Sequence, residues 1–323
     1  MKLVAYESRA QSRVGLIHNN QVVDIRRVIE FLEHGKVPRT LSQRTSFDRA
    51  MRAVVGLGLA PRDMIELLGC GERWRKALAV VSSALARTLD PAKAPRGLFT
   101  PLAKVRLLAP IPKPGKITCV GRNYAEHARE HGNEPPEQPI FFVKSGNTIC
   151  GPGDPICLPP NSSQVDYEAE FAVVIGKKGN RIPEEKAYDY IAGYMVINDV
   201  SARDMQYNDH QWYRGKSCDT FAPTGPWITT RDEIKDPHNL HISLSLNGET
   251  MQDSNTSNLI FSVPYLISYL SQSATWEVGD LISTGTPPGV GVFRKPPVFL
   301  KAGDTVSITV EGLGTLTNPV VGP

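Results

Sequence analysis

Two glutamates separated by one residue are the first feature of the sequence that suggests chemistry. Glu168 and Glu170 lie in the run from Val165 to Ile175, whose composition predicts a β-strand. A period of two places both carboxylates on one face of that strand and Tyr167 and Phe171 on the other. Two neighbouring negative charges beside apolar residues must be offset by water, a cationic side chain or a metal ion. The simpler alternative is a solvated polar face.

A third carboxylate follows another apolar run. Asp199 comes just after Ile191 to Ile197, and the segment Ser201 to Asp204 has the S-x-x-D form of a helix N-cap. Asp199 is therefore expected at a strand-to-helix junction. Oxygen ligands without Cys or His suit a hard ion such as Mg²⁺, or alternatively Mn²⁺ or Ca²⁺, better than zinc. The three acidic residues are candidate ligands of a divalent metal.

A histidine and a carboxylate three residues apart form a second candidate site. Val120 to Glu130 passes from a strand-like run through glycine into a short helical segment, so His127 and Glu130 share one face. Such a pair is the usual arrangement of a general base, because the carboxylate fixes the imidazole tautomer and stabilises its charged form. An ordinary surface ion pair is the alternative. The following segment, Gly132 to Pro136, has the composition of a mobile loop or lid.

Further polar groups could bind an anionic substrate. Lys216, Arg203 and Gln206 could neutralise or orient it, although each alone could be an ordinary surface side chain. The segment Ser283 to Gly291 leaves a strand and enters a Gly/Pro turn. Its backbone amides and the Thr286 hydroxyl could hold a carboxylate, with a plain turn as the alternative.

Composition excludes several functional classes. The chain has 323 residues and a formal net charge of +3, and its Lys and Arg are scattered rather than clustered, which argues against nucleic acid as a partner. No apolar stretch reaches the ~18 residues of a membrane span, so a membrane is not expected as a partner either. The segment Met1 to Ser8 reads as a strand rather than a signal peptide, and the five cysteines form no C-x-x-C pair. These observations predict a cytoplasmic protein with reduced cysteines.

The elements around these residues predict two domains. Apolar runs flanking His18 to Gln21 predict a hairpin, and Trp74, Leu78, Val81 and Leu85 predict an amphipathic helix over about 71–89. Repeated prolines then predict an extended connector over 91–114, between a small domain at 1–90 and a larger one at 115–323. The larger domain is expected to be mainly β, with strands over four runs: Phe171 to Ile175, Leu240 to Leu246, Leu281 to Thr284 and Thr305 to Val310.

Five motifs occur together and in order: Gly121 to Tyr124 with His127 and Glu130, Asp166 to Glu170, Asn198 to Asp204, Gly215 to Ser217, and Thr284 to Pro287. They closely resemble motifs of the fumarylacetoacetate hydrolase family, over roughly residues 115–321. Asp219 to Pro223 and Gly291 to Leu300 resemble the domain-containing protein 2 branch of that family.

The resemblance implies a fold and a set of roles. The fold would be mainly β within the α+β class, with a mixed β-roll catalytic domain and a small α+β N-terminal domain. The metal, Mg²⁺ or Mn²⁺, would be held by Glu168, Glu170 and Asp199, usually in a homodimer. The remaining roles implied are the catalytic His127, Glu130 and Lys216 and the substrate-binding Arg203, Gln206, Gly285 and Thr286.

These roles predict hydrolysis of a C–C bond in a small oxo-acid, an acylpyruvate. His127 would activate a water that adds to the distal carbonyl, and the metal and Lys216 would stabilise the departing pyruvate enolate. The alternative is an oxaloacetate decarboxylase or an oxaloacetate keto-enol tautomerase, in which the histidine only shuttles protons. A third possibility is a non-catalytic metal-binding homologue.

Overall fold

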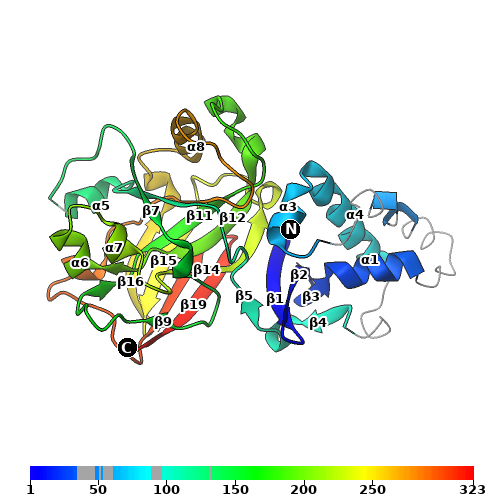
Figure 1. The fold of residues 1–323 in the computed structure, drawn as a ribbon, viewed down its shortest axis with the longest axis horizontal. Helices are drawn as coiled ribbons and strands as arrows, with labels where there is room; N and C mark the ends of the chain where they lie inside the picture. Colours follow the sequence, from blue (N-terminus) through cyan, green and yellow to red (C-terminus); the bar gives the residue numbers. More distant parts are fainter. Residues whose placement is uncertain (35–47, 51, 54–60, 89–96, 131) are drawn as a thin grey trace. The chain divides into compact units, whose positions relative to one another are not determined.

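The computed structural model describes residues 1–34, 48–50, 52–53, 61–88, 97–130 and 132–323. The chain forms two compact units, Met1–Leu107 and Leu108–Pro323 (Figure 1). Part of the predicted connector, residues 91–96, lies outside the described residues. Its later part contains three short elements: β4 (Phe99–Pro101), the 3-10 helix η2 (Leu102–Lys104) and β5 (Leu107–Leu108).

The N-terminal unit contains a small antiparallel sheet in the order β4-β3-β2-β1, made with β1 (Lys2–Ser8), β2 (Gln11–His18) and β3 (Gln21–Asp24). The predicted hairpin is confirmed, because His18 pairs with Gln21 across the turn. Asn19 and Asn20 have φ angles of 47° and 59° there, which asparagine tolerates in a two-residue turn.

The unit also contains the helices α1 (Ile25–His34), α3 (Met64–Gly69) and α4 (Glu72–Thr88). Helix α4 confirms the helix predicted over about 71–89. Its residues Trp74, Leu78 and Val81 are buried, as the spacing predicts, while the side chain of Leu85 lies outside the described part.

The larger unit is built on a mixed sheet in the order β14-β12-β11-β17-β6-β7. Only β17 and β6 run parallel within this path, and β8 adds a further parallel pairing to β14. Every residue of β11 and β12 is buried, which explains their uninterrupted apolar runs. The strands are β6 (Ile117–Gly121), β7 (Ile140–Lys144), β8 (Ile149–Cys150), β11 (Ala169–Ile175), β12 (Ile191–Asn198), β14 (Ala222–Thr230) and β17 (Leu281–Ser283).

A second sheet of this unit has the order β16-β15-β18-β19-β9, and β10 pairs with β13 beside it. All four predicted strands are confirmed, as β11, β15, β17 and β18. Both sheets contribute to one apolar core, which includes Phe171, Tyr194, Ile242 and Ile308. The strands are β9 (Ile156–Cys157), β10 (Val165–Asp166), β13 (Ser201–Ala202), β15 (His241–Leu246), β16 (Glu249–Asn255), β18 (Thr305–Val310) and β19 (Gly314–Val321).

Short helices complete the unit and confirm the predicted α+β class. Helices α5, α6 and α7 lie together at one edge of it in Figure 1. No described helix is both long enough and apolar enough to cross a membrane. The helices are α5 (Ala125–Glu130), α6 (Arg203–Asn208), α7 (Tyr213–Lys216) and α8 (Val263–Ser271), with 3-10 helices η3 (Gly146–Thr148), η4 (Glu184–Tyr190), η5 (Arg231–Glu233), η6 (Thr256–Asn258) and η7 (Gly291–Phe293).

The predicted N-cap at Ser201 is wrong. Ser201 belongs to β13 and pairs with Asp166, which holds it in an extended conformation. Its hydroxyl donates to the Asp199 carbonyl oxygen at 2.9 Å instead of capping a helix. Helix α6 begins at Arg203, and Ala202 occupies the N-cap position without a side-chain hydrogen bond. Asp199 therefore lies between β12 and β13, one short strand before the helix.

Candidate metal centre and active site

The three candidate metal ligands converge in the interior of the larger unit. Glu170 is on β11, Glu168 just precedes it, and Asp199 directly follows β12. Antiparallel pairing sets Ala169 opposite Asn198, and the Asp199 N–H donates to the Glu168 carbonyl at 3.1 Å. One carboxylate oxygen of each ligand lies within 4.8 Å of the other two, and all three residues are buried. The solvated face that was the simpler alternative is excluded.

Among the described residues, the environment of Glu170 lacks a paired cation that would stabilise its ionised form. Its Oε2 accepts hydrogen bonds from Ser283 Oγ at 2.5 Å and from the Gly285 N–H at 2.8 Å. Burial, together with the charges of Asp199 and Glu168, raises the pKa of Glu170 well above its ordinary value. Within the described chain no Lys, Arg or His forms an ion pair with it. Three buried carboxylates with one left uncompensated form an oxygen donor set that could bind a divalent metal.

Lys216 at the end of α7 compensates the other two carboxylates. Its Nζ lies 2.8 Å from both Glu168 Oε2 and Asp199 Oδ2. Burial lowers the pKa of Lys216, but the charges of Asp199 and Glu168 outweigh burial and raise it above its ordinary value. Burial likewise works against ionisation of Glu168, yet the charges of Lys216 and Arg203 hold the pKa of Glu168 well below its usual range. The ionised form of Glu168 is therefore favoured, whereas ionisation of Glu170 is disfavoured.

Lys144 is a second buried lysine at this centre, and the sequence argument missed it. Its Nζ donates to Asp199 Oδ1 at 2.5 Å and to the Val200 carbonyl at 3.0 Å, and its side chain is fully buried. The signal available in the sequence was a lysine ending the apolar run of β7. Asp199 thus contacts two ammonium groups, one on each carboxylate oxygen.

We expect Lys144→Met to destabilise the folded protein by about 3–5 kcal/mol, because removal of one partner leaves the buried Asp199 carboxylate undercompensated. Urea unfolding in the presence of a chelator measures the change. The matched control is Lys178→Met, since Lys178 pairs with Glu277 at an exposed site and should cost under about 1 kcal/mol. Equal unfolding midpoints for the two variants would contradict a structural role for Lys144.

Arg203 at the start of α6 is held on several sides. Its Nε contacts Asp166 Oδ2 and its Nη1 contacts Glu168 Oε1, both at 2.8 Å, and Nη1 also donates to Gln206 Oε1 at 2.9 Å. Asp166 in turn accepts the backbone N–H groups of Gly291 and Val292. The remaining nitrogen, Nη2, is buried without a hydrogen-bond partner among the described residues. A buried guanidinium donor of this kind is suited to a bound anion.

The predicted pair on α5 is in contact. His127 Nδ1 lies 3.3 Å from Glu130 Oε2, and the His127 side chain is buried whereas that of Glu130 is 27% exposed. The other carboxylate oxygen, Oε1, accepts the Gly289 N–H at 2.9 Å. This second bond ties the end of α5 to the turn after β17. The carboxylate is thereby fixed from two sides and orients the imidazole.

The turn after β17 is positioned by Gln252, another residue that the sequence argument missed. Gln252 Nε2 donates to Thr286 Oγ1 and to the Pro287 carbonyl, both at 2.8 Å, while its Oε1 accepts the Ala169 N–H. Because Thr286 Oγ1 accepts from Gln252, its own hydroxyl proton can be donated to a ligand. The amide of Gly285, by contrast, is already engaged by Glu170.

These groups surround one cleft. The residues that line it are Val120, Gly121, Arg122, His127, Phe142, Glu168, Glu170, Arg203, Gln206, Trp212, Lys216 and Thr286. Of the other predicted site residues, Asp199 and Gly285 contact the buried carboxylates and Glu130 contacts His127. The predicted residues therefore form one spatial cluster. The His127 imidazole, the carboxylates of the acidic triad and the unpaired Nη2 of Arg203 lie around the same cleft.

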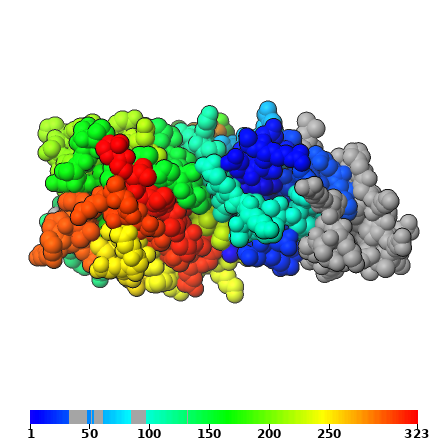
Figure 2. Space-filling view, turned by 90° about the horizontal axis from the view of Figure 1, so that it is seen from below, coloured from blue at the N-terminus to red at the C-terminus, as the bar shows by residue number. Residues whose placement is uncertain are grey.

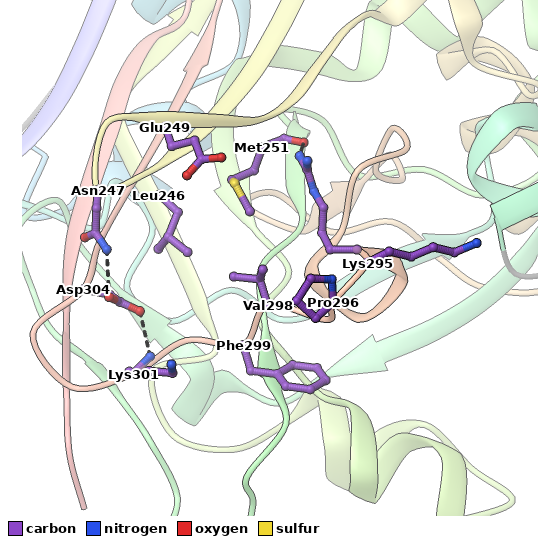
Figure 3. Close-up of a pocket in the computed structure, with 11 residues that line it drawn as sticks. Leu246, Asn247, Glu249, Met251, Lys295, Pro296, Val298, Phe299, Lys301 and Asp304 are labelled. Atoms are coloured by element: carbon purple, nitrogen blue, oxygen red, sulfur yellow. Dashed lines mark hydrogen bonds between the residues drawn. The ribbon is translucent and has the colours of Figure 1, made fainter.

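A second cavity, of about 520 Å³, lies apart from this cleft and shares no lining residue with it. Figure 2 shows its two borders side by side: the β15–β16 hairpin in yellow and the segment after residue 290 in orange. In Figure 3, Met251 and Val298 point into the cavity, Lys295 extends away from it, and Asp304 bonds to Asn247 and to the Lys301 amide. It contains none of the groups that make the cleft a candidate active site.

Comparison with known proteins places the chain in a family. Residues 116–321 match the family described as fumarylacetoacetate (FAA) hydrolase C-terminal. The chain is 49% identical over 263 residues to oxaloacetate tautomerase FAHD2A, mitochondrial, of Bos taurus, covering 81% of this chain and 80% of that protein. The fold, with its buried acidic triad beside a histidine–glutamate pair, is that of the hydrolases and isomerases of this family. The chain belongs to the fumarylacetoacetate hydrolase family.

Solved structures support the assignment. Fumarylacetoacetate hydrolase from Exiguobacterium antarcticum is 31% identical with a TM-score of 0.77, and the match covers all of both chains. Maleylpyruvate hydrolase from Sphingobium sp. SYK-6, in complex with manganese(II) and pyruvate, is 29% identical with a TM-score of 0.71, covering 100% of this chain and 99% of that one. The latter structure shows that this fold accommodates a divalent metal.

The predicted cytoplasmic location is wrong. The bovine relative and a human relative, oxaloacetate tautomerase FAHD2A, 47% identical over 81% of this chain and 80% of that protein, are both named mitochondrial. These names point to mitochondria rather than the cytoplasm. The first residues do form a strand, β1, but a strand carries no information about the compartment in which the folded protein resides.

Proposed function

We propose that the protein is an oxaloacetate tautomerase that interconverts the enol and keto forms of oxaloacetate with Mg²⁺ at Glu168, Glu170 and Asp199. The observation that carries the proposal is the cleft that gathers a proton-transfer group, His127, and anion-binding donors around a buried acidic triad in a chain 49% identical to a named oxaloacetate tautomerase. This function replaces the acylpyruvate hydrolysis favoured by the sequence argument, and it was the alternative there.

The reaction moves protons and neither adds nor removes other atoms. One proton leaves the enol hydroxyl on C2 and one reaches C3, so no water is consumed and no C–C bond breaks. His127 exchanges the proton through Nε2, because Nδ1 contacts Glu130. Thr286 and the unpaired Nη2 of Arg203 bind carboxylate oxygens of the substrate.

The proposed metal ion contributes only its charge to the reaction. When bound by the triad, a divalent metal supplies positive charge that favours an anionic oxygen in the substrate. Mg²⁺ suits three carboxylate oxygens and keeps waters that a substrate can displace, and Mn²⁺ is the alternative in view of the manganese in the maleylpyruvate hydrolase structure. We propose a homodimer as the working assembly, as the family resemblance implied.

The test is a direct comparison of three reactions with Mg²⁺ present. We expect the protein to accelerate the decay of enol-oxaloacetate absorbance in the ultraviolet well above the spontaneous rate, and a chelator to remove this acceleration. Acetylpyruvate cleavage and pyruvate release from oxaloacetate should be slower by a large factor. Rapid acetylpyruvate cleavage without ketonisation would restore the hydrolase, rapid pyruvate release would favour a decarboxylase, and no activity despite metal binding would indicate a non-catalytic homologue.

A further inference from the structure

Arg122 is a cation in the cleft that the proposed reaction does not yet use. It follows β6 and lines the same space as His127 and Lys216. Its Nε is buried without a hydrogen-bond partner, and in the described part of the chain no acidic side chain pairs with its guanidinium. Arg122 as a whole is half-buried, and a buried guanidinium donor without a protein partner is suited to an anionic ligand.

The other cations of the centre are differently placed. Lys144, Lys216 and Arg203 each form ion pairs with the buried acids. Of the four buried carboxylates there, Asp166, Glu168 and Asp199 pair with these three cations, and Glu170 has no ion pair among the described residues. A metal would offset the excess negative charge of that group, whereas Arg122 takes part in none of the ion pairs of that group among the described residues.

The surroundings of Arg122 hold it in place. Its guanidinium carbon lies 5.9 Å from the ring centroid of Trp212, which packs edge-on against Phe142 at 5.3 Å. A Cβ on Gly121 would lie 2.7 Å from the Trp212 ring, so only glycine admits the ring at this position. Arg122 itself has φ of 56°, a left-handed conformation that is costly for a residue with a side chain and is characteristic of functional sites.

We infer that Arg122 recognises the second carboxylate of a dicarboxylic oxo-acid and so determines substrate specificity. This inference rests on the proposed function and deepens it. Oxaloacetate carries one carboxylate beside its keto group and another at the far end of the molecule. The metal-site end of the cleft serves the first, and the second needs a separate cation with paired N–H donors, which a guanidinium supplies. An acylpyruvate with a neutral acyl end would not use Arg122.

Oxaloacetate and pyruvate form a matched pair of probes, because they differ only in the far carboxylate. Calorimetric titration with Mg²⁺ present should show tighter binding of fresh oxaloacetate than of pyruvate to the wild type. Arg122→Gln should weaken oxaloacetate binding by about 10- to 100-fold, the value of a charge-assisted contact, and leave pyruvate binding unchanged. Arg122→Lys should keep part of the preference, since it retains the charge.

Arg129→Gln is the control for long-range charge, because Arg129 lies exposed on α5 and does not line the cleft. It should leave both affinities unchanged. Equal weakening of both probes in Arg122→Gln, an unchanged ratio, or a wild type without preference for oxaloacetate would each overturn the inference. Failure of the proposed function is seen separately, as absent ketonisation by a wild type whose two affinities still differ.

Discussion

Glu170→Gln is expected to abolish Mg²⁺-dependent ketonisation while leaving the metal-free protein at least as stable as the wild type. An amide cannot replace the anionic ligand, so metal affinity should fall by more than the ~10–100-fold seen for groups behind the ligands. The amide does, however, imitate the neutral carboxyl that burial and the neighbouring charges favour at this position. Titration calorimetry with Mg²⁺ and thermal unfolding in chelator measure the two effects.

The same variant should change the dependence of stability on pH. A raised pKa means that folded Glu170 keeps a proton that the unfolded chain releases, so in chelator stability falls as pH rises from the ordinary value of 4.5 toward the raised one. Glu170→Gln removes this contribution, and the difference between the two proteins should therefore widen with pH. A difference that is constant with pH would contradict the raised pKa of Glu170, and a variant that binds Mg²⁺ normally would contradict its assignment as a ligand.

His127→Ala is expected to lower the rate of ketonisation by about 10²–10⁴-fold, the usual contribution of a positioned acid–base group. Metal affinity should survive, because His127 is not among the three carboxylates of the triad. Steady-state ketonisation and Mg²⁺ titration of the same preparation give both quantities. Glu130→Gln is the graded companion: it keeps the side-chain shape and removes the charge that orients the imidazole, so its loss should be smaller.

An unchanged rate in His127→Ala would exclude this histidine from proton transfer and shift attention to Lys216, another ionisable group that lines the cleft. A loss of Mg²⁺ affinity equal to the loss of rate would instead show that His127 supports the metal centre. The two results are separable because metal binding is measured without substrate.

Local patterns were sufficient for much of the fold. The period of two over Val165 to Ile175 placed Phe171 in the core and both glutamates on the opposite face, and the Asn19–Asn20 turn defined the β2–β3 hairpin. The cap at Ser201 failed because a tertiary interaction, its pairing with Asp166, overrides the local motif. Local signals succeed where neighbours in sequence decide the conformation.

The site was harder to predict than the strands. The ordered motifs brought the predicted residues into one list, but nothing local indicated that Lys144 reaches Asp199, 55 residues away, or that Gln252 reaches Thr286, 34 residues away. Both contacts depend on which strands become neighbours. Both glutamates are buried, and the cations Lys216 and Arg203, which lower the pKa of Glu168 and form no ion pair with Glu170 among the described residues, are likewise brought there by tertiary packing.

The bond between Glu130 and the Gly289 amide joins segments 159 residues apart, and its opening can be used to measure motion at the cleft. A backbone proton held by a side chain exchanges with deuterated water only while that bond is broken. The exchange rate of the Gly289 proton therefore reports how often the end of α5 departs from the turn that carries Thr286. A ligand that bridges the two segments would slow this exchange. The exchange rate of this one amide therefore reports ligand binding in the cleft without an activity assay.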